Sequence, residues 1–310
     1  MTRRFPVVLL LSLSLFAAGC SKSSSDTTVA APADTTGAAA ETTAASTAET
    51  TAAGAAETTA ASSSDTAAPA AVAEPKLITA GKVTVCSDIP YAPFEYYENG
   101  ADGAVVGIDA ELVNAIAADN GLTADFIKTP FDGIFAALAA GNCDIIASSV
   151  SITDERKAAN DFTDPYFTIQ QTILVSSADG STLNDTPALK GKKVGAQAAT
   201  TGASFAKAEG TKNGFNVTEF QGADEMIAAL KAGQVDAVIQ DSPINGYAAT
   251  QSNGELVVSK VFPGAGEAYG FVVPKANPAL RDAMNASLKE LQDSGKYKEI
   301  VSKYLGAAAG

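Results

Sequence analysis

Two eighteen-residue stretches share one pattern, and this repeat constrains the fold of the 310-residue chain more than any other feature. FDGIFAALAAGNCDIIAS spans residues 131–148, and ADEMIAALKAGQVDAVIQ spans residues 223–240. Seven of the eighteen aligned positions are identical, including a glycine and two aspartates in each copy. Each stretch predicts a helix, a glycine turn and a strand. The repeat indicates two similar α/β lobes, although any two helix–turn–strand units can share such chemistry.

The remaining pattern from residue 76 onward also alternates between strand and helix. Strands are expected at residues 82–87, 124–128 and 143–148, and helices at 110–120, 131–140 and 279–292. Such alternation predicts mainly parallel sheets with helices on both faces. Ligands of open α/β sheets bind beyond the carboxyl ends of the strands. Ser148 and Ser149 lie at the end of the first copy of the repeat and Asp241 follows the second copy, so we expect these residues to meet at one cleft.

Composition narrows the possible functions. The chain has no histidine, three cysteines and a net charge of −14. Without histidine there is no Ser-His-Asp triad and no His-ligated zinc site, and three cysteines cannot form a Cys₄ site. The acidic balance is unlike that of a nucleic-acid-binding protein. We therefore expect no metal, no cofactor and no nucleic-acid partner.

The first 19 residues resemble a secretory signal peptide. Two arginines precede a short apolar run at residues 5–16, which is too short for a permanent membrane span. The ending Ala17-Ala18-Gly19-Cys20 resembles the lipobox of bacterial lipoproteins, in which Cys20 would carry the lipid. The alternative is an ordinary secretory signal with an incidental cysteine.

A low-complexity segment follows Cys20 and extends to residue 75. Residues 21–75 contain 40 Ala, Thr or Ser, no Leu, Ile, Phe or Tyr, and three tandem octamers such as AAETTAAS. This composition cannot bury enough apolar surface to offset the entropy of ordering. We predict a disordered tether, which as a coil would span roughly 40 Å.

Several residues at the expected strand ends have binding chemistry. Arg156 lies in the first turn of an expected helix, where the helix dipole disfavours a cation unless an anion is near. A guanidinium can clamp a carboxylate through two hydrogen bonds, although Arg156 could equally be a surface residue paired with Asp154 or a neighbour. Asp88 and Tyr91 follow the first strand, whereas Phe94 is expected in the core.

Taken together, these segments resemble the extracytoplasmic solute-binding proteins of family 3, the polar amino-acid receptors of ABC importers. The resemblance spans residues 82–305 and is carried by SDIPYAPFE, GIDAELV, FDGIFAAL, DIIASSVSITDERK, FTDPYF, VGAQAATTG and DAVIQDSP. It implies an α/β, two-lobed periplasmic-binding-protein fold with the ligand cleft between the lobes. Lobe 1 would comprise residues 76–168 and 267–310, and lobe 2 residues 169–266.

The resemblance also implies roles for ten residues in holding an amino-acid ligand. Arg156, Ser151 and Thr201 would bind the α-carboxylate, and Asp241 the α-ammonium, with Ser149 opposite. The others would surround the ligand side chain: Tyr91, Phe131, Asp88, Ser148 and Gln197. Asp109 would be structural. The loop at Ala198-Ala199 departs from the family, where a glycine usually precedes the threonines.

The expected protein is a monomeric, non-enzymatic, lipid-anchored receptor outside the cell membrane. It would deliver a basic or amide L-amino acid to an ABC permease by lobe closure. One alternative is a cyclohexadienyl-type dehydratase, for which Glu95 is the candidate general acid. Another is an amino-acid sensor lipoprotein with no transport role.

Because Cys86 and Cys143 fall at opposite ends of expected parallel strands, we predict no disulfide between them.

Overall fold

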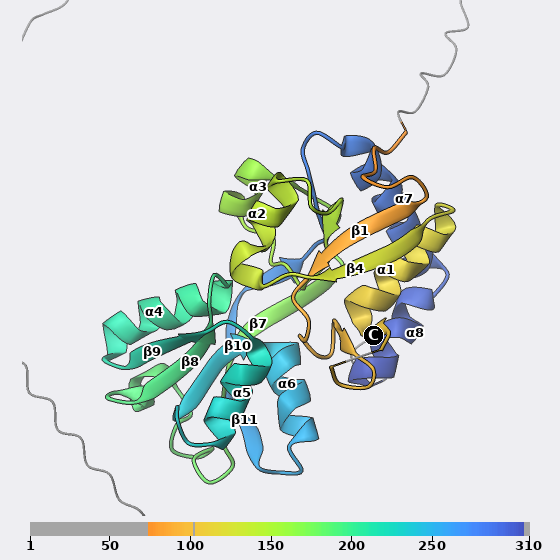
Figure 1. Ribbon diagram of the computed structural model, residues 1–310. Coiled ribbons are helices and arrows are strands. Elements are labelled where there is room, and N and C mark those ends of the chain that lie inside the picture. The colour runs from red at the N-terminus through yellow and green to blue at the C-terminus, as the bar shows by residue number, and fades with distance from the viewer. Residues whose placement is uncertain (1–73, 102, 307–310) are drawn as a thin grey trace, which may run out of the picture. The chain divides into compact units, whose positions relative to one another are not determined.

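The computed structural model describes residues 74–101 and 103–306 (Figure 1). The predicted signal peptide, Cys20 and nearly all of the predicted tether lie outside these residues. The described chain builds two five-stranded sheets and a small hairpin of β2 (Tyr96–Tyr97) and β3 (Val105–Val106). We call the part around the first sheet lobe 1 and the part around the second sheet lobe 2.

Lobe 1 is built around a βαβαβ unit. Its elements are β1 (Lys82–Ser87), α1 (Ile108–Asp119), β4 (Thr123–Lys128), α2 (Ile134–Ala139) and β5 (Ile145–Ile146), with a short 3₁₀ turn η1 (Phe131–Gly133) before α2. The strand β1 lies between β4 and β5 and is parallel to both. The sheet is completed by antiparallel β12 (Val272–Val273) and β6 (Asp161–Phe162). The strand order is therefore β4-β1-β5-β12-β6.

Lobe 2 repeats this topology. Its unit consists of β8 (Lys193–Gln197), α4 (Thr201–Asn213), β9 (Asn216–Phe220), α5 (Ala223–Lys231) and β10 (Ala237–Asp241). The strand β8 lies between β9 and β10, parallel to both, and β7 (Phe167–Ser176) and β11 (Leu256–Tyr269) add antiparallel neighbours. The strand order β9-β8-β10-β7-β11 matches that of lobe 1, so the predicted repeat is confirmed. Each sheet is mixed, with two parallel and two antiparallel pairs, whereas the alternation of elements predicted mainly parallel sheets; the parallel pairs are those of the βαβαβ units.

The identical residues of the repeat have matching structural roles. Gly141 and Gly233 follow α2 and α5 with φ of 74° and 69°, a left-handed backbone that favours glycine. Asp144 accepts the Thr84 N–H at 2.7 Å, and Asp236 accepts the Lys193 N–H at 2.8 Å. Each aspartate thus connects the start of the third strand of its unit to the central strand.

Helices cover both faces of each sheet (Figure 1). In lobe 1, α1, α7 (Pro278–Asp293) and α8 (Lys296–Leu305) contribute to one apolar cluster, and α2 contributes to another. In lobe 2, α4 packs in one cluster, whereas α5 and α6 (Ser242–Gln251) pack in a second. Met284 of α7 is buried with Leu280 and Leu288 in the first of these clusters.

The structure overturns the prediction about the cysteines. Cys86 and Cys143 form a disulfide, with their Cα atoms 5.7 Å apart. The prediction assumed that Cys143 begins an extended strand, but β5 begins only at Ile145. Cys143 instead lies in the turn after α2 and packs in the same apolar cluster as Cys86. The chain therefore reaches Cys86 from the α2 face of the sheet.

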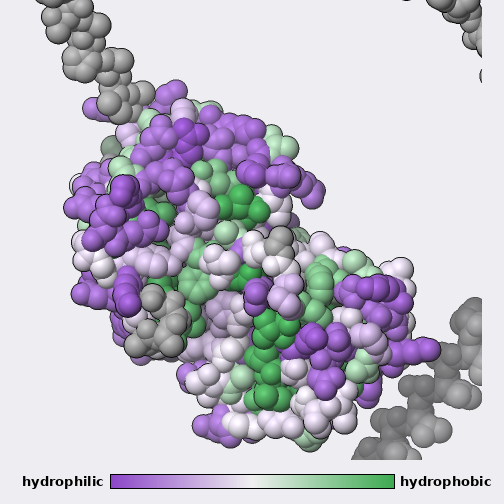
Figure 2. Space-filling view, turned by 180° about the vertical axis from the view of Figure 1, so that it is seen from behind, coloured by the Kyte–Doolittle hydropathy of each residue, from purple (hydrophilic) through white to green (hydrophobic). Residues whose placement is uncertain are grey.

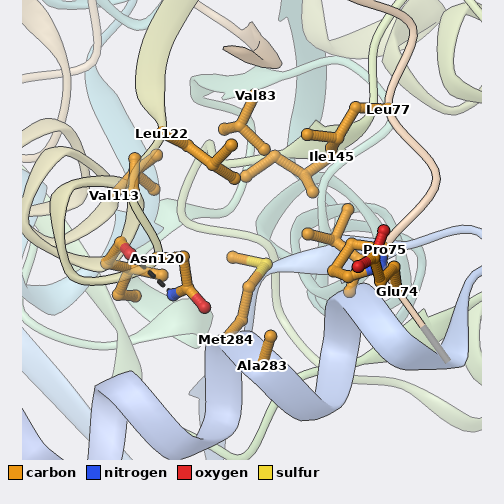
Figure 3. Close-up of a pocket in the computed structure, with 13 residues that line it drawn as sticks. Glu74, Pro75, Leu77, Val83, Val113, Asn120, Leu122, Ile145, Ala283 and Met284 are labelled. Atoms are coloured by element: carbon orange, nitrogen blue, oxygen red, sulfur yellow. Dashed lines mark hydrogen bonds between the residues drawn. The ribbon is translucent and has the colours of Figure 1, made fainter. Parts of the chain in front are cut away.

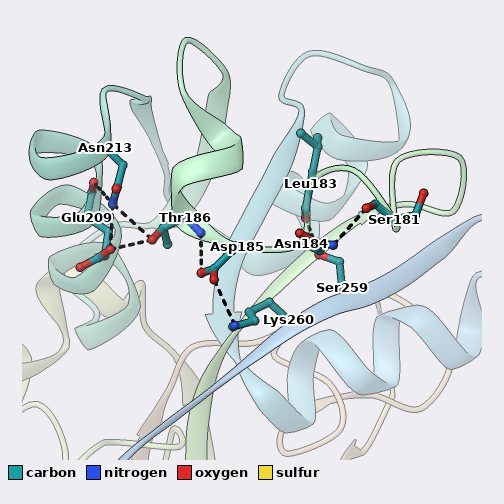
Figure 4. A network of polar contacts seen from close by, with 9 residues as sticks. All are labelled: Ser181, Leu183, Asn184, Asp185, Thr186, Glu209, Asn213, Ser259 and Lys260. Carbon is teal, nitrogen blue, oxygen red and sulfur yellow. Dashed lines mark hydrogen bonds and ion pairs between the residues drawn. The ribbon is translucent and has the colours of Figure 1, made fainter.

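The segment between β7 and β8 is held to lobe 2 by a polar network (Figure 4). Asp185 accepts hydrogen bonds from the Thr186 N–H at 2.9 Å and from Lys260 Nζ at 3.2 Å. Thr186 Oγ1 donates to Glu209 at 2.7 Å, and Asn213 donates to the same carboxylate. These contacts connect the short 3₁₀ turn η2 (Thr186–Leu189) to β11 and α4.

Polar residues cover much of the upper part of the face in Figure 2, and apolar residues show between them toward the middle. Four large apolar side chains are exposed in the described chain: Ile78, Ile127, Val257 and Val261. Val257 and Val261 belong to β11, which is the edge strand of its sheet. Most large apolar side chains are therefore used in the four buried clusters.

Candidate functional site

Two neighbouring strands of lobe 1 bring predicted site residues together. Asp88 follows β1 and Ser148 follows β5, and these strands are adjacent and parallel. The Asp88 N–H donates to Ser148 Oγ at 3.0 Å, and Ser87 Oγ donates to the Ala147 carbonyl at 2.7 Å. The carboxyl ends of these two strands are thus held together by side-chain-to-backbone hydrogen bonds.

A group of buried acids lies behind Ser148 and Ser149. Ser148 Oγ donates to Glu95 Oε1 at 2.8 Å, and the Ser149 N–H donates to Asp109 Oδ2 at 2.8 Å. Burial and the neighbouring Asp109 raise the pKa of Glu95 well above its usual value. Burial also raises the pKa of Asp109 to about 7, although a hydrogen bond from Tyr166 lowers it. These contacts fix the two serines in position.

Arg156 is held at the start of α3 (Asp154–Ala159), where Thr153 caps the helix by accepting the Arg156 N–H. Its guanidinium donates to the carbonyls of Ser151 at 2.9 Å and Ala199 at 3.2 Å. The rings of Phe131 and Phe135 lie 5.5 Å and 5.3 Å from its Cζ atom. Burial lowers the pKa of Arg156 from its usual value.

These contacts favour the ligand-binding interpretation of Arg156 over the surface one. The surface alternative paired Arg156 with Asp154 or a neighbour, but Asp154 pairs with Lys157 at 3.0 Å. The Arg156 side chain instead reaches between the lobes. Its guanidinium donates to neutral carbonyl oxygens. A negatively charged carboxylate would accept stronger hydrogen bonds from the same N–H groups.

Asp241 ends β10 and is buried in lobe 2. It accepts hydrogen bonds from Gln171 Nε2 at 2.6 Å and from the Tyr269 hydroxyl at 2.5 Å. Burial raises the pKa of Asp241 to about 6, although both hydrogen bonds and Arg156 lower it. At neutral pH this carboxylate is therefore mostly charged and available to a cation.

The sequence reasoning missed Gln171 and Tyr269. Both reach Asp241 from strands that pair antiparallel: Gln171 lies opposite Asp241 in β7, and Tyr269 ends β11. The only available signal was strand register, which the local pattern does not reveal. Thr200 was also missed; it accepts the Ala203 N–H and so caps α4.

Three hydrogen bonds join the lobes at the site. Gln197 Nε2 donates to Asp88 Oδ2 at 2.6 Å, Arg156 donates to the Ala199 carbonyl, and the hydroxyls of Ser151 and Thr201 lie 3.3 Å apart. Ala199 has a φ of 62°, so the chain adopts a left-handed backbone beside the unusual alanine pair. The departure from the family pattern thus leaves an alanine in a conformation that favours glycine.

The predicted residues converge on one cavity between the lobes. Nine of the ten line it, together with Thr200: Tyr91, Phe131, Ser148, Ser149, Ser151, Arg156, Gln197, Thr201 and Asp241. Asp88, the tenth, is bonded to Gln197. The cavity measures about 10 Å³, which is too small for an amino acid, so entry of such a ligand requires the lobes to separate. Its lining offers a cation and an anion, the partners that a zwitterion needs when it leaves water.

A second cavity has different chemistry (Figure 3). It measures about 360 Å³ and lies in lobe 1 between β1, α1 and α7. Its lining is almost entirely apolar, with side chains such as Val83, Ile145 and Met284, and its main polar residues are Glu74 and Asn120. It supplies no cation, so it does not fit a zwitterionic ligand.

Neither metal ligation nor membrane spanning is indicated by the residues that the structure describes. Across residues 74–101 and 103–306, no cluster of three or more Cys, Asp or Glu is arranged to hold a metal ion. Within the same ranges, no helix has both the length and the apolar character needed to cross a membrane.

The mixed sheets, the repeated topology and the polar cavity between the lobes define a two-lobed α/β binding protein. The sequence profile of the bacterial extracellular solute-binding proteins, family 3, matches residues 83–307. The chain belongs to this family, and the predicted resemblance and fold class are confirmed.

Named relatives are binding proteins for amino acids. A probable histidine-binding protein of Neisseria gonorrhoeae is 34% identical over 233 residues, which cover 74% of this chain and 85% of that protein. An amino acid ABC transporter substrate-binding protein from Streptococcus pneumoniae, solved with L-arginine, is 30% identical with a TM-score of 0.68. Its match covers 74% of this chain and 97% of that one.

One structural neighbour is related to an enzyme. The ancestral amino-acid-binding protein AncCDT-1, described as a precursor of cyclohexadienyl dehydratase, is 32% identical with a TM-score of 0.66. Its match covers 73% of this chain and 95% of that one. The fold is therefore shared by binding proteins and by a line that leads to a dehydratase.

Proposed function

We propose that this chain is the extracytoplasmic receptor of an ABC importer for a polar L-amino acid with a basic or amide side chain. The observation that carries the proposal is that Arg156 and Asp241, one from each lobe, line the same cavity. Arg156 binds the ligand α-carboxylate with Ser151 and Thr201, and Asp241 binds the α-ammonium. A ligand that bridges the lobes stabilises the closed form, which the permease then recognises.

The ligand side chain points toward Asp88 between the rings of Tyr91 and Phe131. Asp88 is nearly fully buried, so a donor-bearing side chain suits it better than an apolar one. The arginine-bound and histidine-binding relatives support a basic ligand. Arginine is the first ligand to test.

The proposal includes export and lipid attachment. Residues 1–19 direct the chain out of the cell, Cys20 carries the lipid, and residues 21–75 tether the two lobes to the outer face of the membrane. The Cys86–Cys143 disulfide supports an oxidising compartment. Labelling with a radioactive fatty acid in cells, compared with a Cys20→Ser variant, tests the attachment.

Calorimetric titration tests the receptor function. The chain from Ser21 onward, which lacks the lipid acceptor, is titrated with each of the twenty amino acids. We expect at least one basic or amide amino acid to bind with a Kd below about 100 μM. Binding of none of the twenty at this level would contradict the proposed ligand class.

A dehydratase is the second candidate function. It is favoured by the relation to AncCDT-1 and by the buried Glu95, whose pKa is raised by burial and by the neighbouring Asp109, as suits a general acid. Against it, Glu95 lies behind Ser148 and does not line the cavity. Incubation with prephenate or arogenate, followed by ultraviolet absorbance, decides between the two functions.

A sensor without a transport partner would also bind the ligand. In that case, deletion of the gene would leave uptake of the ligand by cells unchanged.

A further inference from the structure

An apolar groove in lobe 1 lies at the opposite end of the sheet from the polar cavity. This groove is the space of about 360 Å³ in Figure 3, and it is lined by Val83 near the start of β1, Ile145 at the start of β5 and Leu122 just before β4. The three strands are parallel, so their amino ends share one edge of the sheet. Their carboxyl ends, which carry the polar site, share the other edge. The groove is therefore separate from the amino-acid site.

The groove opens onto the main apolar cluster of lobe 1. Its walls include Val83, Val113, Ile145 and Met284, which are buried members of that cluster. Protein interiors contain few voids larger than a water molecule, whereas about 360 Å³ is within the range of ligand pockets. Apolar walls around such a space are stabilised when another apolar group covers them. The groove therefore suits an apolar occupant.

The chain enters the described structure at the rim of this groove. Glu74, Pro75 and Leu77 line it. Between them, Lys76 is fixed to lobe 1 through both of its backbone groups. Its N–H donates to Asn277 Oδ1 at 3.2 Å, and its carbonyl accepts a hydrogen bond from Asn277 Nδ2 at 2.6 Å. Because Asn277 directly precedes α7, which forms one wall, the segment before Glu74 begins against the groove.

The composition of that segment matches the groove. Residues 67–73 read AAPAAVA and carry no charge, whereas each upstream octamer carries a glutamate. Val72 is one of two valines in residues 21–75, which contain no larger aliphatic side chain and no aromatic one. An extended chain spans about 3.3 Å per residue, so Val72 lies within about 7 Å of Glu74. The segment therefore brings its largest apolar side chain to the rim.

We propose that residues 67–73 pack into this groove, with Val72 against Met284 and the neighbouring apolar side chains. The proposal goes beyond the receptor function and does not depend on it. Burial of Val72 offsets part of the entropy lost by a short segment that is already anchored at Lys76. The tether then leaves lobe 1 at the end opposite the amino-acid site, and its free part is residues 21–66.

Val72→Asp places a charge in the groove, and Val29→Asp makes the same change at the other valine as the matched control. In the chain from Ser21 onward, we expect Val72→Asp to lower the melting temperature by about 2 °C or more. It should also increase the fluorescence of the apolar dye anilinonaphthalene sulfonate, because the groove is uncovered. Val29→Asp should match wild type in both measurements. Both variants should keep the wild-type Kd for arginine.

A disulfide trap tests the position of the segment directly. Val72→Cys is combined with Ala283→Cys, whose position lines the groove, or with Ala286→Cys, whose position is exposed on the same helix outside the groove. Under mild oxidation, we expect the first pair to cross-link about tenfold or more faster than the second, because docking raises the effective concentration of the two thiols. Mass spectrometry of the digested protein measures both rates.

The outcomes separate the proposed occupant from others. Val72→Asp that matches Val29→Asp in melting temperature and dye fluorescence overturns the proposal, as does equal cross-linking of the two cysteine pairs. Wild type that binds the dye as strongly as Val72→Asp also overturns it, because the groove is then open to a different apolar ligand. A dimer in sedimentation that Val72→Asp leaves intact and Met284→Asp dissociates would assign the groove to a second copy instead. Failure of wild type to bind arginine, with the differences between the valine variants intact, would contradict the proposed receptor function alone.

Discussion

Arg156 shows at the scale of one residue how a charged group is prepared for a ligand. Two aromatic rings flank its guanidinium, and carbonyls from both lobes accept its hydrogen bonds. Carbonyl partners satisfy the N–H groups without neutralising the charge. A ligand carboxylate can replace the Ala199 carbonyl and form the stronger, charge-assisted pair.

Arg156→Lys should raise the Kd for the amino-acid ligand by about 100-fold or more, because lysine lacks the planar fork and leaves the ligand carboxylate poorly paired. Titration calorimetry measures the change. Lys157→Ala is the control. Because Lys157 pairs with the exposed Asp154, this variant should bind ligand normally. Tight ligand binding by Arg156→Lys would exclude the clamp.

Residue patterns predicted much of the site because its groups follow strands in the local sequence. Asp88 and Ser148 follow β1 and β5, and Asp241 is the last residue of β10; all three lie at the carboxyl ends of strands, where an α/β sheet places its ligand contacts. Gln171 and Tyr269 could not be found this way, because they reach Asp241 through antiparallel pairing. Such register depends on tertiary contacts between distant segments.

At the scale of elements, the repeat predicted α2 and α5 because helix periodicity and glycine turns are local signals. The length of β5 was not predictable. The strand contains only Ile145 and Ile146. Beyond it, the chain leaves the sheet, and serine side chains take part in hydrogen bonds there. Because β5 is so short, Cys143 lies in the turn before it, beside Cys86. The longer strand expected from the sequence did not predict this position.

The disulfide should stabilise lobe 1 substantially. It joins residues 57 apart in sequence, and closing such a loop contributes about 4 kcal/mol through the unfolded chain. The double substitution Cys86→Ser/Cys143→Ser should therefore lower the unfolding free energy and melting temperature, as measured by urea denaturation and calorimetry. Ligand affinity should persist, because neither cysteine lines the cavity.

Reduced wild-type protein is the control and should unfold at the same urea concentration as the double variant. An unfolding free energy that does not change on removal of the bond would contradict the structural pairing.

At the scale of the whole molecule, the site joins the two lobes through acids that burial makes harder to ionise. Burial raises the pKa values of Asp88 and Asp241 from 3.8 to about 6. The folded state therefore holds protons more tightly than the unfolded state between these values. Protonation should stabilise the fold as the pH falls, whereas a cationic ligand requires both carboxylates charged.

Stability and affinity should accordingly change in opposite directions with pH. From about pH 7.5 to about pH 5, the melting temperature without ligand should rise and the Kd for arginine should increase by about tenfold for each acid protonated. Glutamine does not need a charged Asp88, so its Kd should change less than that of arginine. Scanning calorimetry and titration calorimetry at both pH values measure the two trends. An arginine Kd that is independent of pH, or a melting temperature that falls over this range, would mean that these carboxylates do not bind the ligand in their charged form.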